Sequence, residues 1–388
     1  MLKTTVAHSI ELDSKDAIKE VLEQSHENLG DLIPQAGILF TGIDHDHSLI
    51  LNRINEMYPG IELIGCTTDG ELSSVHAFTE DSVTLMLLCS DELVFITGVA
   101  DEISKDTAAN IRRASDSTKV KLGQDPELCI TTPSGLTASG DNIVEGFRQS
   151  LGENFPVFGG NAGDQWRIKV TYQFHENNVY TDAAPFMLVG GPLLYSFGVE
   201  SGWIPIGKKA VVTRSDNHMV YEIENDTALE FFQHHLGKKM GLGEDSIMGD
   251  YPLAVFEEDT DSFYLRAATT FNVETGSLTF VGNVPQGSTI QITHSTRDKI
   301  VEATKTSVNS SVKGYPGTLP SAALCFSCAS RKQVLGTRVE EEYDAFQQYF
   351  PDLPVAGFYT YGEIGPLNRD KPARFHNDTF FNIIIGIE

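Results

Sequence analysis

The sequence predicts an α/β protein of two domains, built from repeated strand-helix-strand units that form mixed, largely parallel sheets. Three observations lead to this prediction: a pattern of strand, amphipathic helix and strand that occurs three times, a length of 388 residues, and a hydrophobic content of 40%. A chain of this length and composition can bury a core in each of two domains. We place the domain boundary near residue 222, which gives domains of residues 1–221 and 222–388.

Each unit opens with a short apolar run that is typical of a buried strand, at residues 37–41, 128–132 and 323–327. An amphipathic helix is expected next. In the third unit, one helix should carry a stripe of apolar side chains that faces the core. These side chains are spaced by four, three and four residues, and they are Val339, Tyr343, Phe346 and Phe350.

The helices of the other two units follow the same pattern. The first carries Ile50, Ile54 and Met57 on its apolar face. The second carries Ile143, Phe147 and Leu151, with Asp141 as the expected cap and Gly152 at its end. A proline and a second strand follow each helix, and a third apolar strand completes each unit, at residues 82–88, 185–189 and 380–385. Units of this kind favour parallel neighbouring strands that are covered by helices.

A different pattern separates the second unit from the third. Residues 228–236 are helix-like, and residues 262–292 are rich in β-formers with a hairpin signal at 274–277. This stretch should add a β-rich part to the second domain.

Charge and composition exclude several classes of protein. The formal net charge is −26, which opposes binding to nucleic acid or to anionic membranes because such binding depends on cationic side chains. Nothing approaches the roughly 20 apolar residues of a membrane span. Charges near the N-terminus oppose a secretory signal, and the five cysteines suggest no disulfide framework. We therefore expect a cytoplasmic location.

Three separated motifs resemble the paired FIST N and FIST C domains. They are IGCTTDGE at residues 64–71, LCFSCASR at 324–331, and AGFYTYGEIGP at 356–366 followed by Phe375-His376-Asn377. The resemblance implies a FIST N-like sensory domain before residue 222 and a FIST C-like domain after it. It also implies intracellular signal transduction and binding of small ligands such as amino acids.

Free-standing members of this size resemble the haem-binding nitric-oxide sensors called NosP, which regulate a separate histidine kinase. That resemblance implies haem as a cofactor and a histidine kinase, or another signalling protein, as the partner. The chain has no CxxCH motif, so covalent attachment of haem is not expected. Four histidines are candidate axial ligands, and each has an ordinary surface role as its alternative. They are His234, His235, His294 and His376.

The first glycine turn follows a strand end, where parallel sheets bind ligands. Its candidate ligand-binding residues are Cys66, Thr67, Asp69 and Glu71, and Tyr359 and Glu363 repeat the pattern in the third unit. The two turns could face one cleft. The alternative is a pair of tight turns that need glycine for a positive φ.

The pair Cys325 and Cys328 is not expected to bind zinc, because the sequence holds no second CxxC. Cys325 should be buried, whereas Cys328 and Arg331 should be exposed at the strand end as further ligand-binding candidates. Arg331 could neutralise a ligand carboxylate or a haem propionate. Residues 44–47, Asp-His-Asp-His, have the residue types of metal ligands but are expected to cap a helix.

Support for catalysis is weak. The sequence has no GxSxG, HExxH or Walker lysine motif, and we do not expect an enzyme. The leading hypothesis is a haem-based sensor of nitric oxide. The first alternative is a haem-free sensor of an amino acid or another metabolite. The second is an enzyme of unknown reaction that uses Cys66, Glu71 or Glu363.

Overall fold

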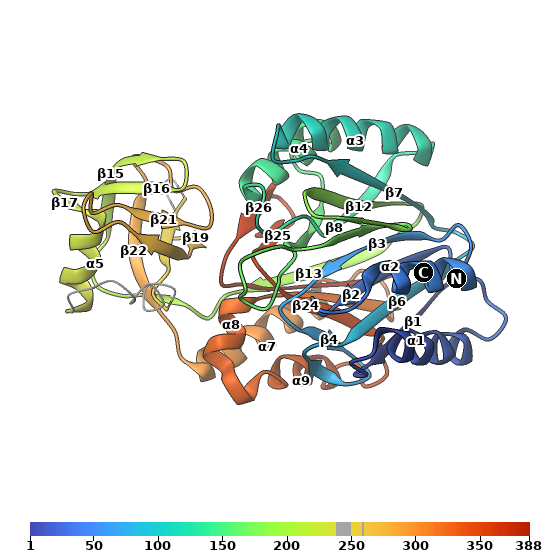
Figure 1. Cartoon of the computed structure of the whole chain (residues 1–388). Coiled ribbons are helices and arrows are strands. Elements are labelled where there is room, and N and C mark those ends of the chain that lie inside the picture. The colour runs from blue at the N-terminus through green and yellow to red at the C-terminus, as the bar shows by residue number, and fades with distance from the viewer. Residues whose placement is uncertain (238–249, 258–259) are drawn as a thin grey trace.

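The computed structural model describes residues 1–237, 250–257 and 260–388. A larger body contains three six-stranded sheets, and a smaller lobe contains a nine-stranded antiparallel sheet, on the left in Figure 1. This arrangement confirms the predicted α/β class with mixed sheets. In the part of the chain that is described, no helix combines the length and the apolar character that a bilayer crossing requires.

The body consists of the three predicted units. Their first strands are β2 (Ala36–Thr41), β8 (Pro126–Thr131) and β23 (Ala322–Cys328). The second strands are β3 (Glu62–Thr67), β9 (Val157–Gly160) and β24 (Val355–Thr360). The third strands are β6 (Val83–Ser90), β12 (Ala183–Gly190) and β27 (Phe380–Gly386). In every unit the first strand lies between a parallel second strand and an antiparallel third strand. Parallel pairing in the described sheets is limited to these three pairs.

One further strand lies beside each third strand. These are β1 (Leu2–Ser9), β7 (Val94–Asp101) and β13 (Leu194–Glu200). The long helices of the body are α1 (Ser14–Leu29), α2 (His47–Met57), α3 (Thr107–Leu122), α4 (Gly140–Leu151) and α7 (Arg297–Gly314). They lie on the outside of the body in Figure 1, so the inner faces of the sheets form a common core. Strands that are covered on both faces read as continuous apolar runs.

The units exchange hairpins in a cycle. The hairpin of β4 (Glu71–Ser73) and β5 (Ala77–Thr79) leaves the first unit and extends the sheet of the third along β24. The hairpin of β10 (Gln173–His175) and β11 (Asn178–Tyr180) leaves the second unit and extends the sheet of the first. The hairpin of β25 (Glu363–Pro366) and β26 (Ala373–His376) leaves the third unit and extends the sheet of the second. The body is therefore interlocked with approximate threefold symmetry.

Equivalent backbone hydrogen bonds join the units where the hairpins cross. The amide of Asp69 donates to the carbonyl of Tyr359, that of Gly163 to Thr67, and that of Tyr361 to Asn161, at 2.9, 2.9 and 3.0 Å. The three residue pairs occupy corresponding positions in the three units. Each unit is therefore aligned with its neighbour in the same way at this end of the strands.

The lobe is inserted between β13 and α7. Its strands are β14 (Ile204–Pro205), β15 (Ala210–Asp216), β16 (Met219–Ile223), β17 (Asp226–Thr227), β18 (Leu253–Phe256), β19 (Phe263–Arg266), β20 (Ala268–Phe271), β21 (Leu278–Phe280) and β22 (Thr289–His294). Helix α5 (Ala228–Leu236) packs on this sheet with the buried Phe231 and Phe232. The predicted helix at 228–236 and the hairpin at 274–277 are confirmed.

The apolar stripe expected in the third unit is confirmed, since Val339, Tyr343 and Phe346 are buried and Phe350 packs against the same cluster as Tyr343 and Phe346. The helix at the centre of this stripe, α9 (Glu341–Gln347), is short. It follows α8 (Ala329–Leu335) and the 3-10 turn η1 (Gly336–Arg338), and Gly336, with a φ of 55°, ends α8. One local prediction was wrong. Asp141 does not cap α4. Its carboxylate lies 2.9 Å from Arg266 of the lobe, while Gly152 ends the helix as predicted.

Candidate functional site

A cavity of about 450 Å³ lies between the body and the lobe. On the body side it is bounded by the ends of three strands, through the loop 135–139 after β8, residues 328–330 after β23, and residues 360–361 after β24. On the lobe side it is bounded by His218, Ala267, Thr269, Phe280 and Val281. This volume is typical of sites for small ligands, and the ends of parallel strands are their usual place.

The cavity occupies one of three corresponding junctions between units. At the junction of the first and second units, the Arg167 guanidinium donates to the Asp44 carboxylate at 2.6 Å. At the junction of the third and first units, the Lys332 ammonium lies 2.7 Å from both Asp69 and Glu80. Ion pairs therefore connect the units across two of the junctions. The third junction, between the second and third units, contains the cavity and is covered by the lobe.

A strained loop forms one wall of the cavity. Gln165, Trp166 and Ile168 have φ values of 56°, 59° and 49°, which are costly for residues other than glycine and especially for a β-branched side chain. Asp164 holds the loop by accepting hydrogen bonds from the amides of residues 168–170 at 3.0, 2.7 and 3.1 Å. The loop thereby presents Trp166 and Ile168 to the cavity, where 45% and 57% of their surfaces are exposed.

Tyr361 joins this loop to the third unit. Its hydroxyl donates to the Asp164 carboxylate at 2.7 Å and accepts a hydrogen bond from the Trp166 amide at 2.6 Å. The rings of Trp166 and Tyr361 also lie 5.7 Å apart, between centroids. A ligand that contacts Tyr361 would therefore act on the strained loop as well.

The two glutamates of the glycine turns do not reach this cavity. Glu71 accepts hydrogen bonds from Thr68 and from the Ser82 hydroxyl, and it is fully buried within its own turn. Glu363 accepts from the hydroxyls of Thr360 and Thr379 at 2.5 and 2.6 Å and is equally buried. Burial raises the pKa of Glu71 to about 7 and that of Glu363 to about 8.

The idea that both turns face one cleft is therefore not supported by their placement. Gly70 and Gly362 have φ values of 120° and 129°, so both turns do require glycine. In the second unit, Gln173 occupies the position that corresponds to these glutamates. Gln173 pairs with Cys66 of the first unit in the same way that Glu363 pairs with Gly160 of the second unit. Sequence comparison of the repeats missed this equivalence, because a loop of residues 164–170 precedes the hairpin only in the second unit.

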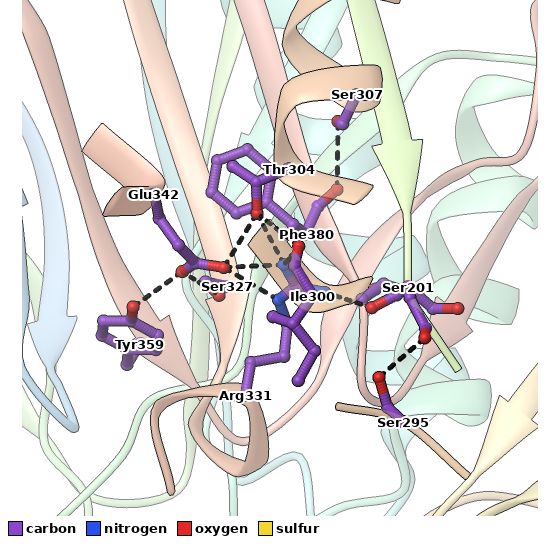
Figure 2. A network of polar contacts seen from close by, with 12 residues as sticks. Ser201, Ser295, Ile300, Thr304, Ser307, Ser327, Arg331, Glu342, Tyr359 and Phe380 are labelled. Atoms are coloured by element: carbon purple, nitrogen blue, oxygen red, sulfur yellow. Dashed lines mark hydrogen bonds and ion pairs between the residues drawn. The ribbon is translucent and has the colours of Figure 1, made fainter. Parts of the chain in front are cut away.

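Arg331 is fully buried, so its predicted exposure was wrong. Figure 2 shows its guanidinium against the carboxylate of Glu342, with a nitrogen-oxygen distance of 2.7 Å. It also donates to the carbonyls of Ser201 and Ile300, which lie where the chain leaves the body for the lobe and where α7 returns. Tyr359 donates to the same Glu342 at 2.6 Å. Arg331 and Tyr359, which were predicted to bind a ligand, therefore form hydrogen bonds within a buried network and do not line the cavity.

The other predicted ligand-binding residues are dispersed. Cys325 is buried as predicted, and Cys328 is only 7% exposed, contrary to expectation, although it lines the cavity. Cys66 belongs to the central core. The Thr67 hydroxyl donates to the Gly163 carbonyl at 2.8 Å, and burial raises the pKa of Asp69, beside Lys332, to about 6.

None of the four candidate haem ligands lines this cavity, and they lie in three separate places, with His234 and His235 together on α5. His234 is exposed beside Asp226, and the ring of His235 lies 4.1 Å from that of Phe231. His294 is exposed against Tyr251. His376 is buried, with Nε2 2.9 Å from the Gly365 carbonyl oxygen, and burial lowers its pKa to about 3. Among the described residues, the histidine that lines the cavity is His218, which belongs to no motif or periodic pattern in the sequence.

Of residues 44–47, Asp46 caps a helix as predicted, whereas His45 and His47 are buried and not solvated. Asp46 accepts a hydrogen bond from the Leu49 amide at 3.0 Å and caps α2. Across the described ranges, no group of three or more histidine, cysteine, aspartate or glutamate side chains is placed to hold a metal ion.

A buried arginine fastens the lobe beside the cavity. Arg266 is 1% exposed and donates to the carbonyl oxygens of Asn283 and Phe375 at 2.9 and 3.0 Å, and to Asp141 at 2.9 Å. Because the Phe375 and Asp141 bonds reach the body while Arg266 and Asn283 belong to the lobe, this side chain connects the two walls of the cavity.

Replacing Arg266 by lysine is expected to lower the free energy of unfolding by about 1.5–3 kcal/mol. Lysine keeps the charge beside Asp141 but loses the planar fork that also reaches the two carbonyls. Urea denaturation of this variant measures the loss. Arg53→Lys is the matched control, because Arg53 forms an exposed pair with Glu56 and should change stability by less than about 0.5 kcal/mol. Equal effects of the two variants would contradict the fastening role.

Comparisons with known proteins agree with the resemblance found in the sequence. The FIST N domain matches residues 35–226, and the FIST C domain matches residues 228–366. An uncharacterized protein of Methanocaldococcus jannaschii is 23% identical over 368 residues, covering 87% of this chain and 70% of that protein. Uncharacterized proteins of Mycobacterium bovis and Mycobacterium tuberculosis are 22% identical over 371 and 375 residues, covering 92% of both chains in each case.

One solved structure, the cyanuric acid hydrolase from A. caulinodans, is similar over 100% of both chains, with a TM-score of 0.38 and 8% identity. This similarity is too low to support an inference about fold or reaction.

Proposed function

Because the chain belongs to the family of proteins that combine a FIST N with a FIST C domain, we propose that it binds a small ligand in the cavity between body and lobe. FIST domains are associated with signal transduction and with the sensing of small ligands. The observation that carries the proposal is that strand ends of two units and the sheet of the lobe line the same cavity. We propose binding, with no catalysis, as its role.

A ligand in this position would connect binding to the placement of the lobe. Any molecule that contacts both Ser330 of the body and Thr269 of the lobe favours the arrangement in which both surfaces meet it. The chain passes between the two parts near Ser201 and again before α7, and Arg331 holds the backbone at both crossings. A change in the lobe is therefore the signal that a partner protein would read.

The haem hypothesis draws no support from this cavity. Haem carries two propionates, and no lysine or arginine of the described chain lines the cavity. Among the described residues that line the cavity, His218 is the single histidine. Haem, nitric oxide and a histidine kinase partner stay predictions from the family resemblance. The visible absorption spectrum of protein purified from cells that are supplied with iron and a haem precursor would test them.

Thr269→Trp is expected to abolish binding by filling the cavity from the lobe. Thr269 is exposed and lies on a short strand, where an aromatic residue is well tolerated. A pool of low-molecular-weight cell metabolites should raise the unfolding temperature of the wild-type protein, because a ligand that binds only the folded state stabilises it. The same pool should leave the unfolding temperature of Thr269→Trp unchanged.

The neighbouring variant Thr270→Trp is the matched control. Thr270 lies on the same strand and is also exposed, but it does not line the cavity. It should respond to the metabolite pool as the wild-type protein does. The proposed function would be wrong if the pool stabilised Thr269→Trp and the wild-type protein equally, or if it stabilised neither Thr270→Trp nor the wild-type protein.

A further inference from the structure

The cavity carries no formal charge on its own wall. In a chain with 21% charged residues, none of its described lining residues is aspartate, glutamate, lysine or arginine. Three aromatic side chains, Trp166, Tyr361 and Phe280, take part in the lining instead. An anion that entered would therefore find no lysine or arginine among the described lining residues to replace its water.

Two hydroxyl groups of the wall, those of Ser330 and Tyr361, donate their hydrogens to carboxylates outside the cavity. Ser330 donates to the carboxylate of Asp378, and Tyr361 donates to that of Asp164 at 2.7 Å. An ionised carboxylate accepts hydrogen bonds and donates none, so each of these hydroxyls is held as its donor. What Ser330 can offer to a ligand is an oxygen lone pair, so this residue favours a ligand group that donates.

Asp378 is an unusual group directly behind this wall. It is fully buried, has a φ of 59°, and its Oδ2 atom has no hydrogen-bond partner. Asn377, its neighbour in sequence, lines the cavity, as does Ser330, to which it is bonded. Arg331 is the nearby cation, but its guanidinium is bonded to Glu342 and to backbone carbonyls. Burial raises the pKa of Asp378 to about 7, so the carboxyl is partly ionised at neutral pH, and a cation bound near Ser330 would favour its ionised form.

We infer that the ligand of this cavity is an organic cation, an amine whose protonated nitrogen lies near Ser330 and whose apolar part packs against the aromatic side chains. This inference rests on the proposed function. Aromatic faces and acceptor oxygens both attract a cation, and the net charge of −26 favours its approach. A carboxylate ligand would meet the same acceptors and the buried Asp378 with no compensating charge.

Three probes of one shape test the charge preference directly. They are 2-phenylethylamine, 2-phenylethanol and 3-phenylpropionate, which at neutral pH are a cation, a neutral molecule and an anion. The readout is tryptophan fluorescence, because the chain has two tryptophans, and Trp203 is buried in a cluster outside the cavity. The amine is expected to give a saturable change with an affinity at least about tenfold higher than that of the alcohol. Trp166→Phe should remove the signal.

Asp378→Asn tests the source of the preference. Asparagine tolerates a positive φ better than other residues, so the backbone can be retained. This variant should bind the amine about tenfold more weakly and the alcohol unchanged. Asp106→Asn is the control, since Asp106 caps α3 and asparagine caps equally well, and it should bind both probes as the wild-type protein does.

Several results would overturn the inference. They are an alcohol that binds as tightly as the amine, a carboxylate that binds more tightly, an amine affinity that Asp378→Asn leaves unchanged, or no response that depends on Trp166 to any of the three probes. The metabolite experiment with Thr269→Trp tests cavity binding separately, so a wrong charge preference and a wrong binding site give different results.

Discussion

Replacing Glu71 and Glu363 together by glutamine is expected to change how the free energy of unfolding depends on pH. Between about pH 5.5 and about pH 8.5, the double variant should lose less stability, or gain more, than the wild-type protein does. In the folded protein burial raises the pKa of these groups to about 7 and about 8. A carboxyl whose folded-state pKa is raised binds its proton more tightly in the folded state. Its contribution is complete below its ordinary pKa and is lost as the pH rises through the raised value.

The loss from the two groups together is on the order of a few kcal/mol, since each unit of pKa corresponds to about 1.4 kcal/mol. Glutamine is a suitable replacement because Gln173 already occupies the corresponding position in the second unit. Its amide donates to the Thr171 hydroxyl at 2.9 Å, and its carbonyl oxygen accepts from the Ala183 amide at 3.3 Å.

Urea denaturation of the double variant and the wild-type protein at the two pH values measures the effect. Burial also raises the pKa of Asp378 to about 7 and lowers the pKa values of His8 and His376 to about 3. These contributions have opposite signs in this pH range but are common to both proteins, so the difference between the two proteins isolates the two glutamates. A dependence as steep as that of the wild-type protein would show that Glu71 and Glu363 are not the groups that bind these protons.

Arg331→Met is expected to lower the free energy of unfolding by about 3–5 kcal/mol. The substitution leaves the carboxylate of Glu342 buried with no cation, and removal of one partner of a buried pair has a cost of this size. Both side chains have no exposed surface. Amide hydrogen exchange in the lobe should also increase, because the carbonyls of Ser201 and Ile300 lose their donor (Figure 2).

Two further variants make this expectation specific. Arg331→Met combined with Glu342→Leu should recover part of the loss, because it removes the unpaired charge. Arg338→Met should cost at most about 1 kcal/mol, since Arg338 is one third exposed in its pairs with Glu341 and Asp298. If Arg331→Met were no more destabilising than Arg338→Met, the network would not be a structural support of the connections to the lobe.

The repeated units were predictable because each has a strong local signal. Apolar runs followed by helical periodicity identify β2, β8 and β23 and the strands that follow the helices. The exchange of hairpins was not predictable from these patterns, since the partner of an edge strand depends on contacts between units that are distant in sequence. The pairing of Glu71 with Phe358 of the third unit is an example.

The site was less predictable for the same reason. Cys328 and Asn377 belong to motifs that the sequence analysis identified, whereas Trp166 and His218 reach the cavity from segments with no such motif. Arg331 was misassigned because a strand end suggested exposure, but α9 brings the carboxylate of Glu342 onto it. Whether an arginine is exposed or buried depends on whether the fold brings a carboxylate to it. The composition and spacing of the sequence do not reveal that partner.

Hydrogen-deuterium exchange of the wild-type protein, with and without the low-molecular-weight metabolite pool, tests the central claim most directly. If a ligand bridges body and lobe, exchange should slow together in the loop 135–139, at residues 328–330 and in the lobe around residues 267–281. Protection confined to one side of the cavity, or found only elsewhere in the chain, would contradict a shared binding site.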